Sequence, residues 1–546
     1  MLPDQQICQL QIKIFREREE ERAHRMGRAF VASSSAGPRA ASVVGGGWAA
    51  LGAAHNLTKA GFRVTVIDAA PETGGLAVEV GIKGFWSHYK NIESLLDDEI
   101  GLPVRDAYNA FSETAFYSAR GLEVVAPVFR DRPRLPAPLG PLVYTLDRFT
   151  GLPLGDRLTA FPLTQSLLEF DLDEETYRAY DLVSFAMLCK TAKVSKKLYD
   201  TFLAPVLLAL LFVPPEELSA AAALSVLKNY VLSHQPDFDV AWPKLPPSAV
   251  FKRWQARLEG LGCSFQSSTR VERVTVSGGV ITGVDAVAAS GEPRRVDSDV
   301  VVLATGAAAL PKIVQASGLD LSCEGLARVG ELTCAPVSAV RIDTGGGPRI
   351  DLGHSANVFA SGPVAGTFFD VGALMGDAAA GRVLEVDWYN ATEDLLESTD
   401  DELARQALGV LAMASSSSAS SALEEGRWSV RAAARVRKAA LRWIPGSHLA
   451  TPQIRPEGAP RGLYVAGDLV RNGPGDFPSH LGARGLSQEK SLVTGLVAGM
   501  EAAKEFGAGG KGLLVPRAVE PEEPHILAAK EAMRLARSAG LSQLLV

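Results

Sequence analysis

The chain reads SVVGGGWAALGAAHNLTKAGFRVTVID over residues 42–68, and this stretch decides the fold. Residues 42–44 are a short apolar strand that leads into Gly45-x-Gly47-x-x-Ala50. In such a pattern the first Gly permits a tight turn, the second lets a pyrophosphate approach the backbone, and the third small residue lets the following helix pack on the sheet. The stretch therefore predicts a nucleotide-binding β-α-β unit.

The elements after this loop fit the same unit. A helix is expected over about residues 49–60, with its N-terminal amides and the positive end of its dipole facing the phosphates. A second strand, 63–67, ends in Asp68, roughly 20 residues past the glycines, where a carboxylate accepts hydrogen bonds from ribose hydroxyls. Gly74 and Gly75 form a second point of close approach. Because all these parts occur in register, a glycine-rich turn without a ligand is a poor alternative.

Composition limits the remaining possibilities. The 546 residues, of which 47% are apolar, can bury large cores, and the length predicts two interleaved domains. The formal net charge of -7 argues against a nucleic-acid partner. The five Cys lack CxxC spacing and the eight His are dispersed, so neither a disulfide framework nor a metal site is indicated. No apolar run reaches the roughly 20 residues of a membrane span.

Two later segments indicate which nucleotide is bound. The run GLYVAGD at 462–468 is a strand that breaks at Gly467 and carries Asp468 at its tip, and residues 269–306 hold strands that end in Ala-Thr-Gly. With the first motif they resemble the flavoprotein superfamily of amine oxidases, protoporphyrinogen oxidases and carotenoid desaturases. The resemblance implies FAD rather than NAD, with Asp468 on the ribityl chain and the backbone of Val271 against the adenine.

Within the superfamily, the stretches 81–92 and 198–225 resemble plant and cyanobacterial carotene desaturases. Gly482 and Ala483 occupy the place of a helix start that, by this resemblance, faces the flavin pyrimidine. The match runs from about 42 to 502 but is specific only at the cofactor motifs.

Two departures weaken any transfer of the substrate. Lys83 stands where desaturases have His, and Leu76 stands where Arg or Lys usually follows the Gly pair. They are compatible with a diverged desaturase on another apolar substrate or with an isomerase.

The predicted fold class is α/β: a Rossmann-type FAD-binding domain assembled from discontinuous segments, with an interleaved α+β substrate-binding domain. The expected segments are 42–90, 266–310 and 451–502 for FAD binding, 91–265 and 311–450 for the substrate, 1–41 as a flexible leader, and 503–546 as a C-terminal tail. The part after Lys511 is interpreted as an appendage, and 414–421 as a low-complexity linker.

Residues 1–41 can be interpreted as a transit peptide or as a plain flexible leader. Residues 24–41 lack acids and are rich in Arg, Ser and Ala, which suits an organelle transit peptide, whereas the acidic cluster before them favours a plain flexible leader. The corresponding locations are a plastid, with a role in carotenoid biosynthesis, or otherwise the cytoplasm.

Two helices expected at 199–211 and 218–232 are apolar on nearly every face. Core packing is the more common explanation for such helices. The functional alternative is that they wall a tunnel for a lipophilic substrate, with 202–232 as its mouth at a membrane surface. Strands expected within 331–450, followed by a helix, would form a sheet that covers the flavin.

The leading hypothesis is an FAD-dependent oxidoreductase that desaturates, or isomerises, a lipophilic carotenoid-like substrate by hydride transfer from an allylic C–H to flavin N5. The reduced flavin is expected to be reoxidised by a quinone or by oxygen, and no amine-binding carboxylate or aromatic pair is evident. Candidate residues that line the flavin or assist proton movement are Lys83, His88, Tyr89 and His480, although each such residue type is more often simply packed. An amine or protoporphyrinogen oxidase and a non-catalytic flavin-binding protein are the alternatives.

Overall fold

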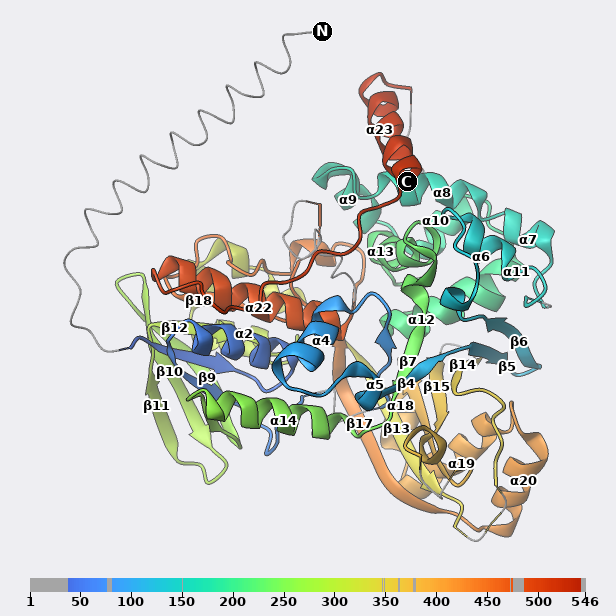
Figure 1. Cartoon of the computed structure of the whole chain (residues 1–546), viewed down its shortest axis with the longest axis horizontal. Helices are drawn as coiled ribbons and strands as arrows, with labels where there is room; N and C mark the ends of the chain where they lie inside the picture. The colour runs from blue at the N-terminus through green and yellow to red at the C-terminus, as the bar shows by residue number, and fades with distance from the viewer. Residues whose placement is uncertain are drawn as a thin grey trace. The chain divides into compact units, whose positions relative to one another are not determined.

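The computed structural model describes residues 38–75, 81–149, 151–345, 347, 349–361, 364–376, 380–471, 473–474 and 486–541. The contacts separate residues 1–39 from a unit of residues 40–546, and the account below concerns this second unit (Figure 1). Among the described helices, none combines the length and the apolar content that crossing a bilayer requires.

A parallel sheet forms the base of the predicted nucleotide unit. Within the described residues it has five strands, in the order β18 (Leu463–Val465), β12 (Val300–Leu303), β1 (Ala40–Val44), β2 (Arg63–Ile67) and β8 (Ser264–Gln266), and every neighbouring pair is parallel. The strand β12 is fully buried and reads VVVL, as expected for a sheet that is covered on both faces. The α/β fold class is thus confirmed, although the domain boundaries stay predictions.

Close packing of two helices covers this sheet. Helix α2 (Trp48–Lys59) runs along α22 (Gln488–Glu505), as Figure 1 shows. A Cβ at Gly495 would overlap the carbonyl oxygen of Ala49, and one at Gly52 would lie 3.0 Å from the carbonyl oxygen of Leu492. Glycine at both positions therefore lets the two backbones approach each other.

The second large sheet belongs to the predicted substrate domain. In the described part of the chain its order is β17 (Ser429–Leu441), β13 (Cys334–Asp343), β16 (Val383–Tyr389), β15 (Val364–Asp370), β14 (Ala356–Ser361), β5 (Thr114–Ser118) and β6 (Gly121–Ala126). Helices α18 (Glu393–Glu397), α19 (Asp400–Leu411) and α20 (Ser416–Glu425) cover one face through a shared apolar core. The predicted linker at 414–421 is wrong, because Ser416 begins helix α20, which packs on α19.

The remaining strands form two small sheets among the described residues. They are β11 (Pro293–Asp297), β10 (Val280–Ala288) and β9 (Thr269–Ser277) in one, and β3 (Phe85–Trp86), β7 (Val240–Pro243) and β4 (Tyr108–Ser112) in the other.

The other helices have the following bounds. They are α4 (Lys90–Ser94), η2 (Leu95–Glu99), α5 (Val104–Ala107), η3 (Phe129–Asp131), α6 (Leu139–Val143), α7 (Leu154–Leu158), α8 (Phe161–Glu169), α9 (Glu174–Asp181), α10 (Phe185–Thr191), α11 (Lys196–Leu198), η4 (Tyr199–Leu203), α12 (Ala204–Leu211), α13 (Ala220–Val231), η5 (Gln235–Phe238), α14 (Pro247–Gly260), α15 (Leu310–Ala316), α16 (Leu319–Ser322), η6 (Glu324–Leu326), η7 (Val329–Glu331), α17 (Val371–Leu374), η8 (Ser447–Leu449) and α23 (Pro524–Ser538).

The two apolar helices predicted around 199–232 correspond to α12 and α13, and both lie in the core. Leu207 is completely buried, and Val206 packs with Phe116 and Val124 of the second sheet. Residues 220–224 of α13 are likewise buried. Of the two interpretations given to these helices, the structure favours core packing over a membrane-facing mouth.

The C-terminal residues 511–541, here called the C-terminal strap, are not an appendage. The Asn56 side chain on α2 accepts a hydrogen bond from Leu514 N at 2.8 Å and donates one to Leu514 O at 3.0 Å. On α4, Asn91 makes the same pair of bonds with Arg517, at 2.6 and 3.3 Å. The strap is therefore fixed to helices α2 and α4.

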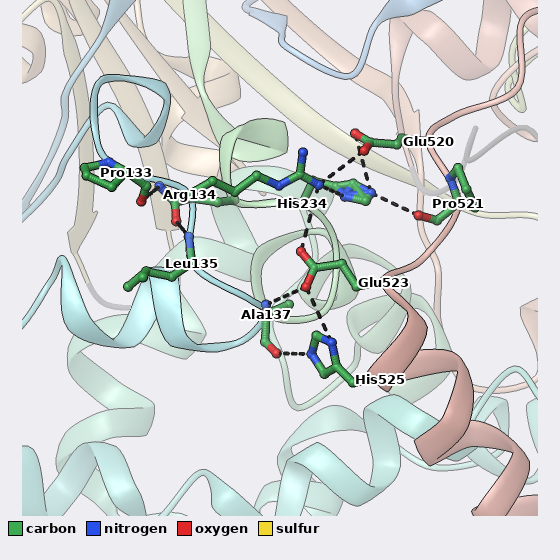
Figure 2. A network of polar contacts seen from close by, with 10 residues as sticks. Pro133, Arg134, Leu135, Ala137, His234, Glu520, Pro521, Glu523 and His525 are labelled. Carbon is green, nitrogen blue, oxygen red and sulfur yellow. Dashed lines mark hydrogen bonds and ion pairs between the residues drawn. The ribbon is translucent and has the colours of Figure 1, made fainter.

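Further along, the strap is fixed to the helical region. Figure 2 shows that Arg134 Nη2 donates to His234 Nδ1 at 2.7 Å and contacts Glu520 Oε1 at 3.2 Å, while His234 Nε2 donates to Pro521 O at 3.0 Å. Ala137 N donates to Glu523 at 3.1 Å. These bonds explain why a segment with a polar, proline-rich sequence is ordered against the protein.

Candidate functional site

The loop after β1 is shaped by glycines that have no room for a side chain. Gly45 has φ +116°, and a Cβ there would lie 2.5 Å from the carbonyl oxygen of Ala304 at the end of β12. A Cβ at Gly46 would overlap Asp68 Oδ2 at the end of β2. The loop therefore passes between the ends of two strands and directly against the predicted ribose-binding carboxylate.

The second glycine pair lies against the same loop. Gly74 N donates to Gly46 O at 2.8 Å, and Gly75, with φ +52°, lies near the Cα of Gly47. Gly47 is the N-cap residue of α2, and a Cβ there would meet only Gly74 O, at 3.8 Å. Space for a group close to the backbone is thus left at the start of α2, as the sequence predicts.

The structure also describes Ala50 and Val271, the remaining residues predicted from this half of the motif. Ala50 is fully buried in the first turn of α2. Thr269 N donates to Asp68 O at 2.8 Å. This bond joins the start of β9, the strand that contains Val271, to the loop that contains Asp68. The Val271 side chain is buried in the core, so contact with an adenine through its backbone remains a prediction.

The tip of β18 is tied to the first turns of α22. Gly467 N donates to Thr494 Oγ1 at 2.9 Å, and Lys490 Nζ donates to the carbonyl oxygen of Asp468 at 2.6 Å. The ammonium group of Lys490 also lies 4.7 Å from the centre of the Trp443 ring. Burial raises the pKa of the Asp468 carboxyl, and the charge of Lys490 opposes that rise. The carboxylate predicted to bind the ribityl chain therefore has a buried cation beside it.

Two buried polar atoms at the same end of the sheet have no hydrogen-bond partner among the described residues. They are Thr305 Oγ1, which follows β12, and Gln266 Oε1, at the end of β8. Buried polar groups normally find partners. The glycines at 45–47 and 74–75 are here called the glycine cradle. Together with this cradle, the two unpartnered atoms fit a bound nucleotide that supplies hydrogen-bonding groups.

Three predicted site residues, His480, Gly482 and Ala483, lie outside the described residues. The same holds for Leu76.

The structure brings His88 and Tyr89 together at the start of α4. Their ring centroids are 5.0 Å apart, and His88 Nδ1 donates to the carbonyl oxygen of Asp237 at 2.8 Å. Burial lowers the pKa of the His88 imidazole. Burial, reinforced by the charge of Glu489, raises the pKa of the Tyr89 phenol above its ordinary value. Tyr89 is therefore suited to donating a hydrogen bond rather than to accepting a proton.

Lys83 belongs to a different group of side chains. Its Nζ donates to Gly81 O at 3.2 Å, and its charge lowers the pKa of Asp387 on β16, although burial raises that pKa by more. One residue further on, Gly84 O accepts from Gln488 Nε2 at 3.1 Å. Residues 81–84 thus contact both the start of α22 and the second sheet.

Sequence reasoning missed a polar and aromatic group on β16. Thr367 Oγ1 donates to Asp387 Oδ2 at 3.2 Å and lies 2.8 Å from the Tyr389 hydroxyl. The Tyr389 ring stacks on Phe212, with centroids 4.2 Å apart, and Phe212 has the left-handed φ of +59°. Asp387 Oδ1 is buried and lacks a hydrogen-bond partner within the described residues.

The sequence shows no evident amine-binding carboxylate or aromatic pair, whereas the structure places the Asp387 carboxyl near the stacked rings of Tyr389 and Phe212. The signal was present in the sequence, because the run VLEVDWY at 383–389 alternates, so that Glu385, Asp387 and Tyr389 share one face of the strand.

Comparisons with known proteins extend this picture. The chain is 26% identical over 276 residues, 47% of its length, to the carotenoid phi-ring synthase of Chlorobaculum tepidum, and 24% identical over 320 residues, 55% of its length, to the "Probable zeta-carotene desaturase" of Synechococcus elongatus. It spans only 41% and 65% of those two curated relatives.

Solved structures of similar fold include the cyclohexylamine oxidase of Brevibacterium oxydans. The TM-score is 0.56 at 15% identity, and the match covers 86% of this chain and all of that one. The model of the family described as flavin containing amine oxidoreductase matches residues 51–475, which is most of the chain. The protein therefore belongs to the flavin-containing amine oxidoreductases, and it is an oxidoreductase of that family.

Proposed function

We propose that the protein is an FAD-dependent oxidoreductase that desaturates, or isomerises, a lipophilic carotenoid-like substrate. The observation that carries the cofactor part is the convergence of the glycine loop, Asp68 and Asp468 at the carboxyl ends of parallel strands. Ligands of open parallel sheets bind at this edge. The names of the two curated relatives, both of which concern carotenoids, support the substrate part.

The proposal assigns roles to the residues of the cradle. Gly45 and Gly47 would let the pyrophosphate approach the backbone, Asp68 would accept from the adenosine ribose, and Asp468 would hold the ribityl chain. When bound, the flavin would accept a hydride from the substrate.

The protein's own contribution to desaturation is mainly orientation and exclusion of water, because an allylic C–H needs no strong general base. The buried phenol of Tyr89 would orient groups by donating a hydrogen bond, and the neutral imidazole of His88 would line the site. Lys83 and His480 remain candidates for assisting proton movement.

One observation favours the second candidate, an amine or protoporphyrinogen oxidase. The buried carboxyl of Asp387 lies beside the stacked pair of Phe212 and Tyr389. A buried carboxyl group and an aromatic pair suit a substrate that carries hydrogen-bonding groups better than they suit a hydrocarbon.

Anaerobic flavin reduction distinguishes the candidates. Bleaching of the flavin absorbance by phytoene or ζ-carotene, with no response to a polyamine, supports the first. The reverse result supports the second. A flavin that responds to neither substrate and cannot be photoreduced would leave a non-catalytic flavin-binding protein and contradict both.

Three accompanying proposals concern the surroundings of the enzyme. A quinone would reoxidise the flavin, and the protein would contact a membrane from one side. Residues 24–41 would direct it to a plastid. Fusion of residues 1–41 to a fluorescent protein tests the last proposal, and diffuse cytoplasmic fluorescence would contradict it.

A further inference from the structure

A group of large apolar side chains is exposed on the helical region. Phe161, the first residue of α8, is 76% exposed, and Leu146 is 51% exposed. We call the following set the α6–α7 surface: Leu142, Val143, Leu146, Leu154, Leu158 and Phe161, all exposed. Scattered single exposed leucines need no explanation, but a contiguous set marks a site of interaction.

Hydrogen bonds show that the elements that carry these residues are adjacent. Arg157 of α7 donates to the carbonyl oxygens of Leu142 in α6 and of Thr145, both at 3.2 Å. Ser195, the N-cap residue of α11, donates from its backbone N–H to Thr159 Oγ1 at 2.9 Å. Helices α6, α7 and α11 therefore lie next to one another, and Figure 1 shows them on one side of the molecule.

Four lysines lie at the border of the α6–α7 surface. Lys190, Lys193, Lys196 and Lys197 are exposed on and between α10 and α11, and Lys196 pairs with Asp200. Within residues 142–161 themselves, the acids Asp147 and Asp156 are equal in number to the bases Arg148 and Arg157. Apolar side chains flanked by lysines complement a bilayer with anionic headgroups, where the apolar part is buried and the lysines meet the lipid charge.

A cavity of about 360 Å³ opens beside this surface. Its walls include Phe116, Tyr199 and Leu208, from β5, η4 and α12, and the charged side chains of Arg120, Glu123, Asp200 and Glu216. Tyr199 directly follows α11, and the Phe149 ring between α6 and α7 lies 5.2 Å from the Phe202 ring of η4. The walls of the cavity thus rest directly on the elements that carry the exposed leucines.

We propose that the α6–α7 surface docks on an anionic bilayer and that the cavity at its edge opens toward the lipid. The docking rests on the exposed side chains and their charge. The role of the cavity as the route of a lipophilic substrate also rests on the function proposed above. This places the membrane contact on α6, α7 and α8 instead of on the buried helix α12.

Flotation with vesicles tests the docking without any substrate. The protein is mixed with phosphatidylcholine vesicles that contain or lack phosphatidylglycerol, at low and high salt. We expect flotation with the anionic vesicles, weakened by salt. The double variant Leu146→Asp/Phe161→Asp should float at least about tenfold less, because a charged group opposes burial in the lipid. Lys196→Glu/Lys197→Glu should lose the preference for anionic lipid.

Leu321→Asp is the matched control, since Leu321 is 91% exposed on α16, away from this surface, and it should float like the wild type. Circular dichroism and melting temperature check that each variant is folded. Wild type that stays in the dense fraction, or equal flotation of the double variant and the wild type, overturns the docking. The docking is also overturned if sedimentation shows that the wild type is a dimer and that the double variant is not, while the double variant still floats with the vesicles.

Turnover separates the docking from the proposed function. On a carotene in detergent micelles the double variant should match the wild type, whereas on the same carotene inside vesicles it should be slower by the fold-change seen in flotation. Flotation without turnover of any carotene contradicts the proposed substrate and leaves the docking standing.

Discussion

The carboxylate of Glu489 caps helix α4 through Asn91, 398 residues earlier in the chain: its Oε1 accepts from Asn91 N at 2.8 Å and from Asn91 Nδ2 at 2.7 Å. Its Oε2 accepts from Ile92 N at 3.0 Å. Free N–H groups in the first turn of α4 are thereby satisfied by a side chain from the first turn of α22. Tyr89, the N-cap residue of α4, is held at the start of α22 as a result.

Replacement of Glu489 by Gln should change how stability depends on pH. Burial raises the pKa of Glu489 from 4.5 to about 7, so between these values the folded state holds a proton that the unfolded state has released. The free energy of unfolding of the wild type therefore falls as pH rises through this window, by at most about 3 kcal/mol from this group. Melting curves across the window should show a smaller fall for Glu489→Gln. Identical slopes for the two proteins would contradict the raised pKa.

Gly47→Trp should yield a folded protein without flavin. The indole would fill the space beside Gly74 O that the backbone leaves open at the start of α2. Flavin released by denaturation is measured per chain, with about one expected for the wild type. Gly409→Trp, on the exposed face of α19 with open space around it, should keep its flavin. Retention of flavin by Gly47→Trp, or bound NAD in the wild type, would overturn the assignment of the cradle.

Asp171→Asn should loosen the C-terminal strap. Asp171 lies 2.8 Å from the ammonium nitrogen of Lys228 and 3.0 Å from that of Lys530 on α23, in a largely buried network with Glu522. Loss of one partner of a buried ion pair costs about 3–5 kcal/mol. The melting temperature should fall clearly, and proteolysis within 511–541 should become faster.

The matched control for the strap is Arg534→Gln. Arg534 pairs with Glu531 on the same helix, but both side chains are more than half exposed. Such a pair contributes less than about 1 kcal/mol. Equal effects of the two substitutions would mean that the buried network does not hold the strap.

Tyr89→Phe should leave the pH dependence of kcat/KM unchanged below pH 10. The pKa of the Tyr89 phenol is raised above the ordinary value of 10.0, so its ionisation does not contribute in this range. A lower kcat with the same profile is the expected sign of lost orientation. An alkaline limb that moves would instead show that Tyr89 transfers a proton. Unchanged turnover after joint replacement of Tyr89 and His480 would remove both from the site.

The sequence by itself determined the nucleotide unit. Every requirement of the loop after β1 is local: Gly45 needs a positive φ, Gly46 needs space beside Asp68, and the helix must begin at once. These requirements act within 27 consecutive residues, so the spacing of the residues encodes them directly. The strand that precedes Gly467 and Asp468 could be predicted as well, because it is a short apolar run that ends at a glycine.

The tertiary structure decided what happens between distant segments. Apolar helices can serve equally as core or as a membrane-facing wall, and the packing of Val206 against the second sheet decided for the core. The alternation of residues 383–389 predicts a two-faced strand, but the contact of its polar face with Phe212 requires the folded chain. Likewise the polar sequence of the strap looks detached until Asn56 and Asn91 supply its hydrogen bonds from more than 400 residues away. The strength of such contacts depends on burial and on partners brought together by packing, and residue spacing along the chain carries no information about either.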